Sequence, residues 1–154
     1  MPYRDPAEYR PPGRHTARIN RLVALLATFG LTPKNTIALE VPGRRSGRTR
    51  RTSLVVAKYE SQRYLVSLAG EAQWVRNLRA NGYHATLRRL TAKPVHLIEI
   101  PVDGRAPILK AYLSKRAYSK SPDYEAREFF GVSRDAPLED LAGIAARYPV
   151  FRIE

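Results

Sequence analysis

The chain has 154 residues, with 27 Lys and Arg against 14 Asp and Glu and no cysteine. This length suits a single domain, which can bury about 70% of the surface that its unfolded chain exposes. The lack of cysteine excludes disulfide scaffolds, zinc fingers, thiol nucleophiles and iron–sulfur clusters. The formal net charge of +13 favours a polyanionic partner: nucleic acid, an acidic membrane face or a highly charged small molecule. Because 21 of the 27 cations are arginine, a GC-rich coding sequence explains the charge equally well.

Residues 1–15 are predicted to form an extended or disordered basic arm, because they combine four prolines with scattered charge and no periodicity. Residues 16–154 then form one domain. The first helix is expected to begin at Thr16 and to end at Gly30. Its apolar face is predicted to pack on a sheet, with a basic amphipathic helix at a membrane surface as the alternative; this face comprises Ile19, Leu22, Val23, Leu26 and Phe29. No apolar run approaches the roughly 20 residues of a membrane span, and the N-terminus has no signal-peptide pattern.

The rest of the chain is predicted to contain six short strands, most of them in consecutive hairpins. They are Thr36–Val41, Ser53–Tyr59, Arg63–Ala69, His84–Leu90, Pro94–Pro101 and Val150–Ile153. Helices are predicted at Glu71–Ala80, from Asp103 to Leu113 and from Pro137 through Ile144, whereas residues 114–134 show no clear period. Sequential hairpins favour an α+β fold with a mostly antiparallel small barrel or curled sheet and helices packed outside.

The strongest local motif is the segment Gly43-Arg44-Arg45-Ser46-Gly47-Arg48-Thr49-Arg50-Arg51, which lies between two predicted strands. Glycines permit positive φ and close approach of a ligand to the backbone, and the amides of such a turn form an anion-binding nest. The five arginines add bidentate, charge-assisted donors, and Lys58 follows on the next strand. The segment therefore predicts a ligand with phosphate and further negative charge; a solvated basic loop or a contact with a nucleic-acid backbone is the alternative. Neither a P-loop nor a Rossmann glycine pattern is present.

A second motif is the segment Ala69-Gly70-Glu71-Ala72-Gln73-Trp74-Val75-Arg76-Asn77-Leu78, where a predicted strand ends and a helix begins. A flat ring fits over such a backbone, with the first amides of the helix facing its polar edge. The only tryptophan, Trp74, serves equally well as a core anchor.

The remaining chemistry-bearing residues give weaker patterns. His84 and His96 lie on one predicted hairpin and can meet, but no carboxylate cluster, nucleophile elbow or metal-ligand spacing accompanies them, so no metal site is predicted. Tyr112, Tyr118 and Tyr124 fall in the irregular C-terminal stretch, where a lid or a pocket wall can form; simple packing is the more common role of such residues. Tyr118 and Tyr124 are the candidates for donating a proton or a hydrogen bond to a reduced substrate.

Taken together, the two motifs resemble the deazaflavin-dependent nitroreductase family. The resemblance rests on Gly43-Arg44-Arg45-Ser46-Gly47-Arg48-Thr49-Arg50 followed by Trp74-Val75-Arg76-Asn77-Leu78-Arg79-Ala80-Asn81, and it extends to the closing Arg147–Phe151. It covers nearly the whole chain from Thr16 to Glu154 and implies a split β-barrel that binds coenzyme F420, a deazaflavin with a phosphate and an oligoglutamate tail.

The resemblance also implies roles for particular residues. The phosphate and the tail are expected to contact Arg44, Arg45, Ser46, Gly47, Arg48, Arg50, Arg51 and, more weakly, Lys58. The deazaflavin ring is expected to be bordered by Ala69, Gly70, Trp74 and Asn77. No catalytic acid or nucleophile is required, because the cofactor carries the chemistry while the protein orients it and excludes water.

The resulting hypothesis is an F420-dependent oxidoreductase that passes a hydride to an electron-poor small molecule: a quinone, an enone or a nitro compound. The alternatives are an FMN-binding barrel oxidoreductase, a non-catalytic carrier of F420 or an anionic lipid, and, least favoured, a nucleic-acid-binding protein. FMN has a phosphate but no glutamate tail, and so gives less reason for five arginines. We expect a cytoplasmic protein and a homodimer, as is common in the family, with peripheral membrane contact through the basic arm and the first helix as an alternative.

Overall fold

The computed structural model describes residues 18, 19, 22, 35–114 and 130–154. Within these ranges six strands form a closed barrel in the order β1-β2-β3-β6-β5-β4, and each pair of neighbours is antiparallel. The strands are β1 (Thr36–Pro42), β2 (Thr49–Tyr59), β3 (Gln62–Val66), β4 (His84–Arg88), β5 (Ala92–Glu99) and β6 (Val150–Ile153). The predicted α+β class and the mostly antiparallel barrel with helices outside are thus confirmed.

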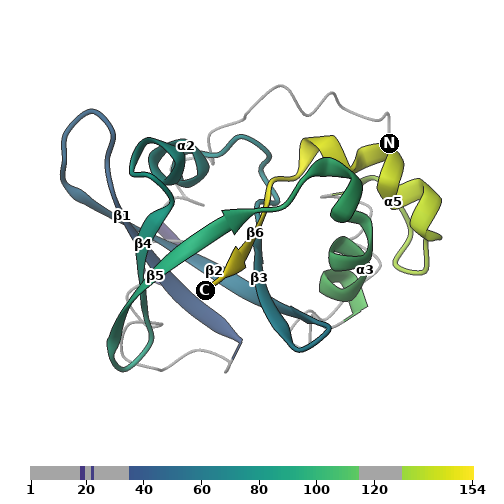
Figure 1. The fold of residues 1–154 in the computed structure, drawn as a ribbon, viewed down its shortest axis with the longest axis horizontal. Helices are drawn as coiled ribbons and strands as arrows, with labels where there is room; N and C mark the ends of the chain where they lie inside the picture. The colour runs from purple at the N-terminus through teal and green to yellow at the C-terminus, as the bar shows by residue number, and fades with distance from the viewer. Residues whose placement is uncertain (1–17, 20–21, 23–34, 115–129) are drawn as a thin grey trace.

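The helices gather in two places around the barrel (Figure 1). Helix α2 (Gln73–Ala80) lies beside β1 near the loop that joins β1 to β2, whereas α3 (Ala106–Ser114) and α5 (Leu138–Ile144) lie together on the opposite side. Short 3₁₀ turns, η1 (Val102–Gly104) and η3 (Ala145–Arg147), precede α3 and follow α5. The structure does not test the prediction that residues 16–154 form one domain. The predicted arm of residues 1–15 lies outside the described residues.

The boundaries differ from prediction where cross-strand pairing overrides local composition. β2 begins at Thr49 rather than at Ser53, because Arg50 and Arg51 pair with Val41 and Glu40 in the β1–β2 ladder. β3 ends at Val66, and the helix that was expected from Glu71 begins at Gln73. Propensity disfavours an arginine-rich strand start, but the ladder hydrogen bonds and the partner strand stabilise it.

The barrel interior is one of two apolar clusters, and α2 closes it. Phe151, Leu65 and Leu97 are fully buried there, together with three side chains of α2 that point inward. The full cluster is Leu39, Val41, Leu65, Ala72, Trp74, Val75, Leu78, Ala85, Leu87, Val95, Leu97, Phe151 and Ile153. Burial of these side chains, at about 25 cal/mol per Å² of apolar area, ties α2 firmly to the barrel.

The second cluster lies between the outer face of β2 and β3 and the helices α3 and α5. Tyr64 and Val66 face this cluster, whereas Leu65 between them faces the barrel interior. Both faces of β3 are therefore covered, which explains why its residues read as a continuous apolar run instead of an alternating one.

The first predicted helix is described only at residues 18, 19 and 22, which are helical. Ile19 and Leu22, which were expected to pack on the sheet, are 50% and 57% exposed. The packing prediction is therefore wrong at these two positions: helical spacing identifies an apolar face but does not identify what covers it.

The turn between β2 and β3 offers a test of local backbone strain. Glu60 and Ser61 both have positive φ, at 45° and 64°, as two-residue hairpin turns require, yet neither is glycine. We expect Ser61→Gly to raise the free energy of unfolding by about 1 kcal/mol, because glycine removes the steric penalty of the left-handed conformation. Chemical denaturation measures this. Gln62→Gly, one residue on in regular strand, should instead be destabilising; a Ser61→Gly variant no more stable than the wild type would contradict the prediction.

Candidate functional site

The loop between β1 and β2, residues 43–48, is held by its own backbone. The amide of Gly43 donates to the carbonyl of Arg48 at 2.9 Å, and the amide of Gly47 donates to the carbonyl of Gly43 at 2.8 Å. Gly47 has a φ of +69°, and a Cβ on Gly43 would lie 3.0 Å from Ser46 Oγ. The left-handed φ of Gly47 therefore favours glycine at that position, whereas a Cβ on Gly43 would require only a small shift of the Ser46 hydroxyl. Ser46 Oγ accepts a hydrogen bond from the amide of Arg48 at 3.3 Å.

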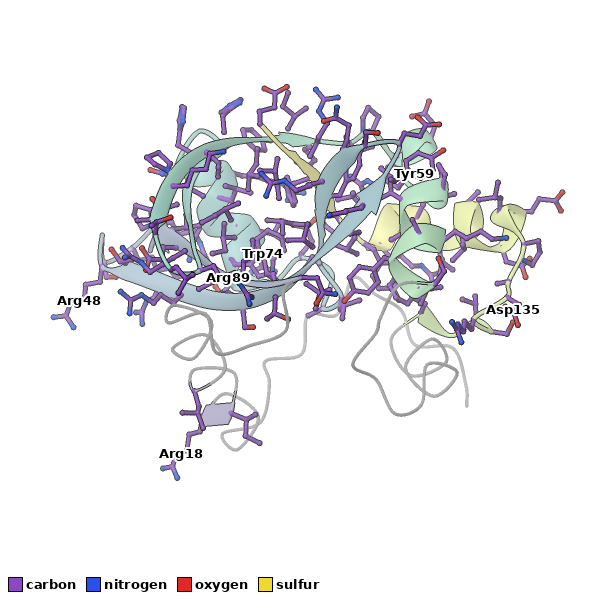
Figure 2. All side chains as sticks on the ribbon, turned by 90° about the horizontal axis from the view of Figure 1, so that it is seen from below. Arg18, Arg48, Tyr59, Trp74, Arg89 and Asp135 are labelled. Carbon is purple, nitrogen blue, oxygen red and sulfur yellow. The ribbon has the colours of Figure 1, made fainter. Side chains whose placement is uncertain are left out.

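The arginines of this segment divide into two groups by what they touch. The side chains of Arg45, Arg48 and Arg50 are exposed and make no hydrogen bond or ion pair with any residue in the described parts of the chain. Figure 2 shows Arg48 pointing away from the barrel at one end of the molecule. Arg44 and Arg51, in contrast, bind other side chains. Within the described ranges, the three exposed guanidinium groups therefore keep their donors for a ligand at the loop.

Arg44 connects the loop to α2. Its Nη1 donates to Gln73 Oε1 at 2.8 Å and to Asn77 Oδ1 at 2.9 Å, and its backbone amide also donates to Asn77 Oδ1 at 3.2 Å. The two sequence motifs, which are well separated along the chain, therefore meet in space. Sequence reasoning placed both motifs at one ligand but did not foresee this contact, because nothing in the spacing of Gln73 and Asn77 identifies a partner.

Arg51 forms an ion pair on the outer face of the barrel. Its Nε lies 2.7 Å from Glu40 Oε1, and Arg88 Nε lies 2.8 Å from the same oxygen. Arg50 and Arg51 lie on opposite faces of β2, because successive strand side chains alternate. One sequence signal points to this pair: Glu40 is a lone carboxylate in an apolar strand, and buried carboxylates are nearly always paired.

The Glu40 pair predicts a pH dependence of stability. Burial alone would raise the pKa of Glu40, but hydrogen bonds and charges from Arg88 and Arg51 outweigh it and hold the pKa below its ordinary value. A carboxyl with a lowered pKa stabilises the fold above its unfolded pKa of about 4.3, and this stability is lost as the pH falls through the folded pKa. We expect Glu40→Gln to lower the free energy of unfolding by about 1–2 kcal/mol at pH 7.

Urea unfolding of wild type and Glu40→Gln from pH 7 to pH 3 checks this expectation. The difference between the two proteins should shrink toward pH 3, because the wild type loses the ion pair there while the variant has none to lose. A constant difference over the whole range would contradict the assigned role of Glu40. Glu139→Gln, at an exposed position on α5, is the control and should change little.

Lys58 lies near the other end of β2 and pairs in register with Arg63. Lys58 is separated from the loop by about 30 Å of extended strand. The structure therefore does not bring Lys58 together with the loop arginines, and its contact with an extended tail stays a prediction.

The turn that precedes α2 is built on Gly70. Its φ is +67°, and its carbonyl accepts hydrogen bonds from Ser67 Oγ at 2.6 Å and from the amide of Ala72 at 2.8 Å. Ala69 is exposed and Gly70 is buried. Ala72 provides no side-chain cap, so the first amides of α2 lack the group that normally satisfies them. This is the geometry that the ring end of a flat ligand was predicted to use.

Trp74 and Asn77 occupy different environments on α2. Trp74 is 8% exposed and packs edge-on against Phe151 in the barrel interior, with ring centroids 5.5 Å apart. The core-anchor role considered for it is thus present in the structure, and contact with a ring stays a prediction. Asn77 is 6% exposed and faces the loop through Arg44. Tyr118 and Tyr124 lie outside the described residues.

His84 and His96, which the sequence places where they can meet, lie in strands as expected. They face each other across β4 and β5 with ring centroids 4.9 Å apart. In the described ranges no group of three or more His, Asp or Glu side chains is placed to hold a metal ion. No helix of the described residues is long and apolar enough to cross a membrane.

An ion-pair network behind α2 fixes the helix to the barrel. Arg79 Nη2 lies 2.6 Å from Glu99 Oε1, and Arg79 Nη1 lies 2.5 Å from Glu71 Oε2. The hydroxyl of Tyr83 also donates to Glu99 Oε2 at 3.3 Å. Burial alone would raise the pKa of Glu99, but the hydrogen bond and charge of Arg79 outweigh it, so the pKa lies below its ordinary value. The network holds the turn at Gly70 and the start of α2 against β5.

Comparison with known protein families shows the family to which the chain belongs. The family model described as F420H(2)-dependent quinone reductase matches residues 14–138, most of the chain. The chain belongs to this family. The resemblance to deazaflavin-dependent enzymes that the motifs carry is confirmed, and an F420-dependent reductase is the corresponding activity class. No curated protein matches the sequence.

Solved structures show the same barrel at low sequence identity. A structure described as a domain-swapped dimer is 15% identical, with a TM-score of 0.50, and the match covers 91% of this chain and 96% of the other. A protein of unknown function from Agrobacterium tumefaciens is 13% identical with a TM-score of 0.50, covering 98% of this chain and 58% of that one. An F420-H2-dependent reductase is 16% identical with a TM-score of 0.48, covering 79% and 95%. At such identities the likeness of the first two establishes the fold alone.

Proposed function

We propose that this member of the F420H(2)-dependent quinone reductase family transfers a hydride from reduced F420 to a quinone. The observation that carries the proposal is the loop of residues 43–48, where Arg45, Arg48 and the adjoining Arg50 are exposed, unpaired among the described residues, and close to a helix that Arg44 joins to the loop. The family supplies the cofactor class, and its description names the acceptor class.

The described residues fit the two charged parts of F420. Two loop glycines allow close approach of a phosphate to the backbone, and Ser46 adds a hydroxyl. The three available guanidinium groups suit the repeated carboxylates of an oligoglutamate tail, because arginine binds carboxylate in bidentate fashion. FMN has no such tail and would leave most of this charge unused.

The uncapped turn at Gly70 and Ala72 is the proposed place for the ring, with Ala69 and Gly70 along its edge. When bound, reduced F420 supplies a hydride, and a quinone that takes it up together with one proton becomes a hydroquinone. The protein holds the cofactor by its charged end, and the buried Trp74–Phe151 packing keeps the wall behind α2 rigid and dry. Tyr118 and Tyr124 remain the candidate proton donors.

Two experiments test the proposal. Purified protein is titrated with F420, read by fluorescence, and with FMN in parallel at low and moderate salt. Reduced F420 is then offered with quinones, enones and nitro compounds. Saturable F420 binding and reoxidation by a quinone would support the proposal. Binding of FMN alone would show that FMN, and not F420, is the cofactor. Tight F420 binding without turnover would indicate a carrier of F420. Binding to nucleic acid alone, with an affinity that falls steeply with salt, would refute the proposed function.

A homodimer is also proposed, because one structural relative is described as a domain-swapped dimer and because Ile19 and Leu22 are exposed on an apolar helix face. Size-exclusion chromatography with light scattering tests this. Cytoplasmic location and peripheral membrane contact remain predictions that fractionation and vesicle binding would address.

A further inference from the structure

Arg44 uses only part of its hydrogen-bonding capacity on α2. Both side-chain bonds, to Gln73 Oε1 and to Asn77 Oδ1, come from Nη1. A guanidinium group has five N–H donors, and neither Nε nor Nη2 takes part in these bonds. The guanidinium thus has one side bound to the helix and another with donors left for a ligand.

The acceptor on α2 is unusually well fixed. Asn77 is 6% exposed and lies on the helix among Trp74, Val75 and Leu78, which are buried in the barrel interior. Its Oδ1 accepts from both the side chain and the backbone amide of Arg44. A buried amide in a helix interior lowers helix stability and is tolerated when it makes specific bonds. Here those bonds go to the loop rather than to the barrel.

We propose that Asn77 and Gln73 are positioning residues for the anion site: they hold Arg44, and with it the β1–β2 loop, in one orientation against α2. This inference rests on the proposed anion-binding role of the loop and assigns Asn77 to the charged end of the ligand rather than to its ring. An exposed arginine loses side-chain entropy when it binds a ligand, and a guanidinium that is already held loses less. Two uncharged side chains outside the loop therefore set its affinity for anions.

The test uses Asn77→Ala and, as a matched control, Asn81→Ala. Asn81 is the same residue type at the end of the same helix, and its side chain donates to the carbonyl of His84 at 2.8 Å rather than to a residue of the loop. Dissociation constants are measured for inorganic pyrophosphate and for F420 at two salt concentrations. We expect Asn77→Ala to weaken both ligands about tenfold and Asn81→Ala to leave them within twofold. The salt dependence should be unchanged in Asn77→Ala, because no charge is removed.

A second measurement needs no ligand. Unfolding of Arg44→Ala, Asn77→Ala and the double variant forms a double-mutant cycle, in which the double variant should lose less stability than the sum of the single losses. If Asn77→Ala does not fold, Gln73→Ala, at an exposed position, removes one acceptor and should weaken pyrophosphate about threefold.

The outcomes separate this inference from the proposed function. If the wild type binds pyrophosphate but does not bind F420, the proposed cofactor is refuted. The pyrophosphate affinities of the variants still test the positioning role. Unchanged anion affinity in Asn77→Ala and Gln73→Ala, or strictly additive stability losses, would overturn the positioning role even if F420 binds. A wild type that binds neither probe would refute the anion site and this inference with it.

Discussion

Replacing Arg45, Arg48 and Arg50 together by serine should weaken the binding of long-tailed F420 about 100-fold, which corresponds to about 2.7 kcal/mol. The three side chains are exposed and make no bond to another described residue, so their removal should leave the fold intact. Exposed charge pairs are each worth about 1 kcal/mol or less, and only their combination on one multivalent ligand gives a large effect. The same variant should lose less affinity for F420 with a truncated tail.

The control must remove the same charge from another part of the surface. Lys93, Lys110 and Arg134 are exposed on β5, on α3 and near Asp135, and Figure 2 shows Asp135 at the opposite end of the molecule from Arg48. A Lys93→Ser, Lys110→Ser and Arg134→Ser variant lowers the net charge of +13 equally. It should weaken F420 binding by less than about threefold at moderate salt, because distant exposed charges are screened beyond roughly 10 Å.

Fluorescence titration of both triple variants with long-tailed and truncated F420 tests whether the loop arginines bind the cofactor or whether the overall positive charge attracts it. Equal losses in the two variants would mean that the overall charge, and not the loop, attracts the cofactor. Equal losses for long and short tails in the loop variant would assign the arginines to the phosphate alone.

Periodicity and turn chemistry predicted a mostly antiparallel small barrel or curled sheet with helices outside, and the family resemblance implied the barrel that the structure shows. Six strands were expected and six are present in the described ranges, and the last of them, Val150–Ile153, has the predicted bounds. The β2–β3 hairpin followed from two β-rich runs around a polar turn. The start of β2 was missed because Thr49 to Thr52 has the composition of a basic loop, and only its pairing with β1 makes it a strand.

The site was predictable as a set of segments and not as a set of contacts. The sequence identified both motifs, but five equivalent arginines in one short segment give no hint that Arg44 bonds to α2 and that Arg51 pairs with Glu40. Strand alternation places Arg50 and Arg51 on opposite faces of β2, whereas the contacts of the other arginines depend on partners that are distant in sequence. The same holds for Trp74, whose burial against Phe151 depends on how α2 closes the barrel.

Arg105→Met should be strongly destabilising, at about 2–3 kcal/mol. Arg105 is 6% exposed and precedes α3. Its Nε donates to the carbonyl of Ile100 at 2.8 Å and its Nη1 to that of Ala145 at 3.2 Å. Its Nη2 lies 3.4 Å from Glu99 Oε1. Methionine keeps much of the side-chain volume but removes the donor to the carbonyl of Ile100, and an unsatisfied buried group costs about 1–3 kcal/mol. The carbonyl of Ala145 keeps the amide of Tyr148, and Glu99 keeps Arg79, so each of these acceptors loses only one of its donors.

Arg152→Met provides the matched control for this prediction. Arg152 pairs with Glu154 at 2.9 Å, but the two side chains are 36% and 47% exposed, so the pair should contribute less than about 1 kcal/mol. Thermal unfolding should show a melting temperature lower by about 10 °C for Arg105→Met and by about 2 °C or less for Arg152→Met. Because Arg105 and Arg79 share Glu99, the loss should also loosen the start of α2 and weaken F420 binding in the folded variant. A melting temperature of Arg105→Met close to that of Arg152→Met would show that the carbonyls and Glu99 find other donors, and that α3 and η3 do not depend on this side chain.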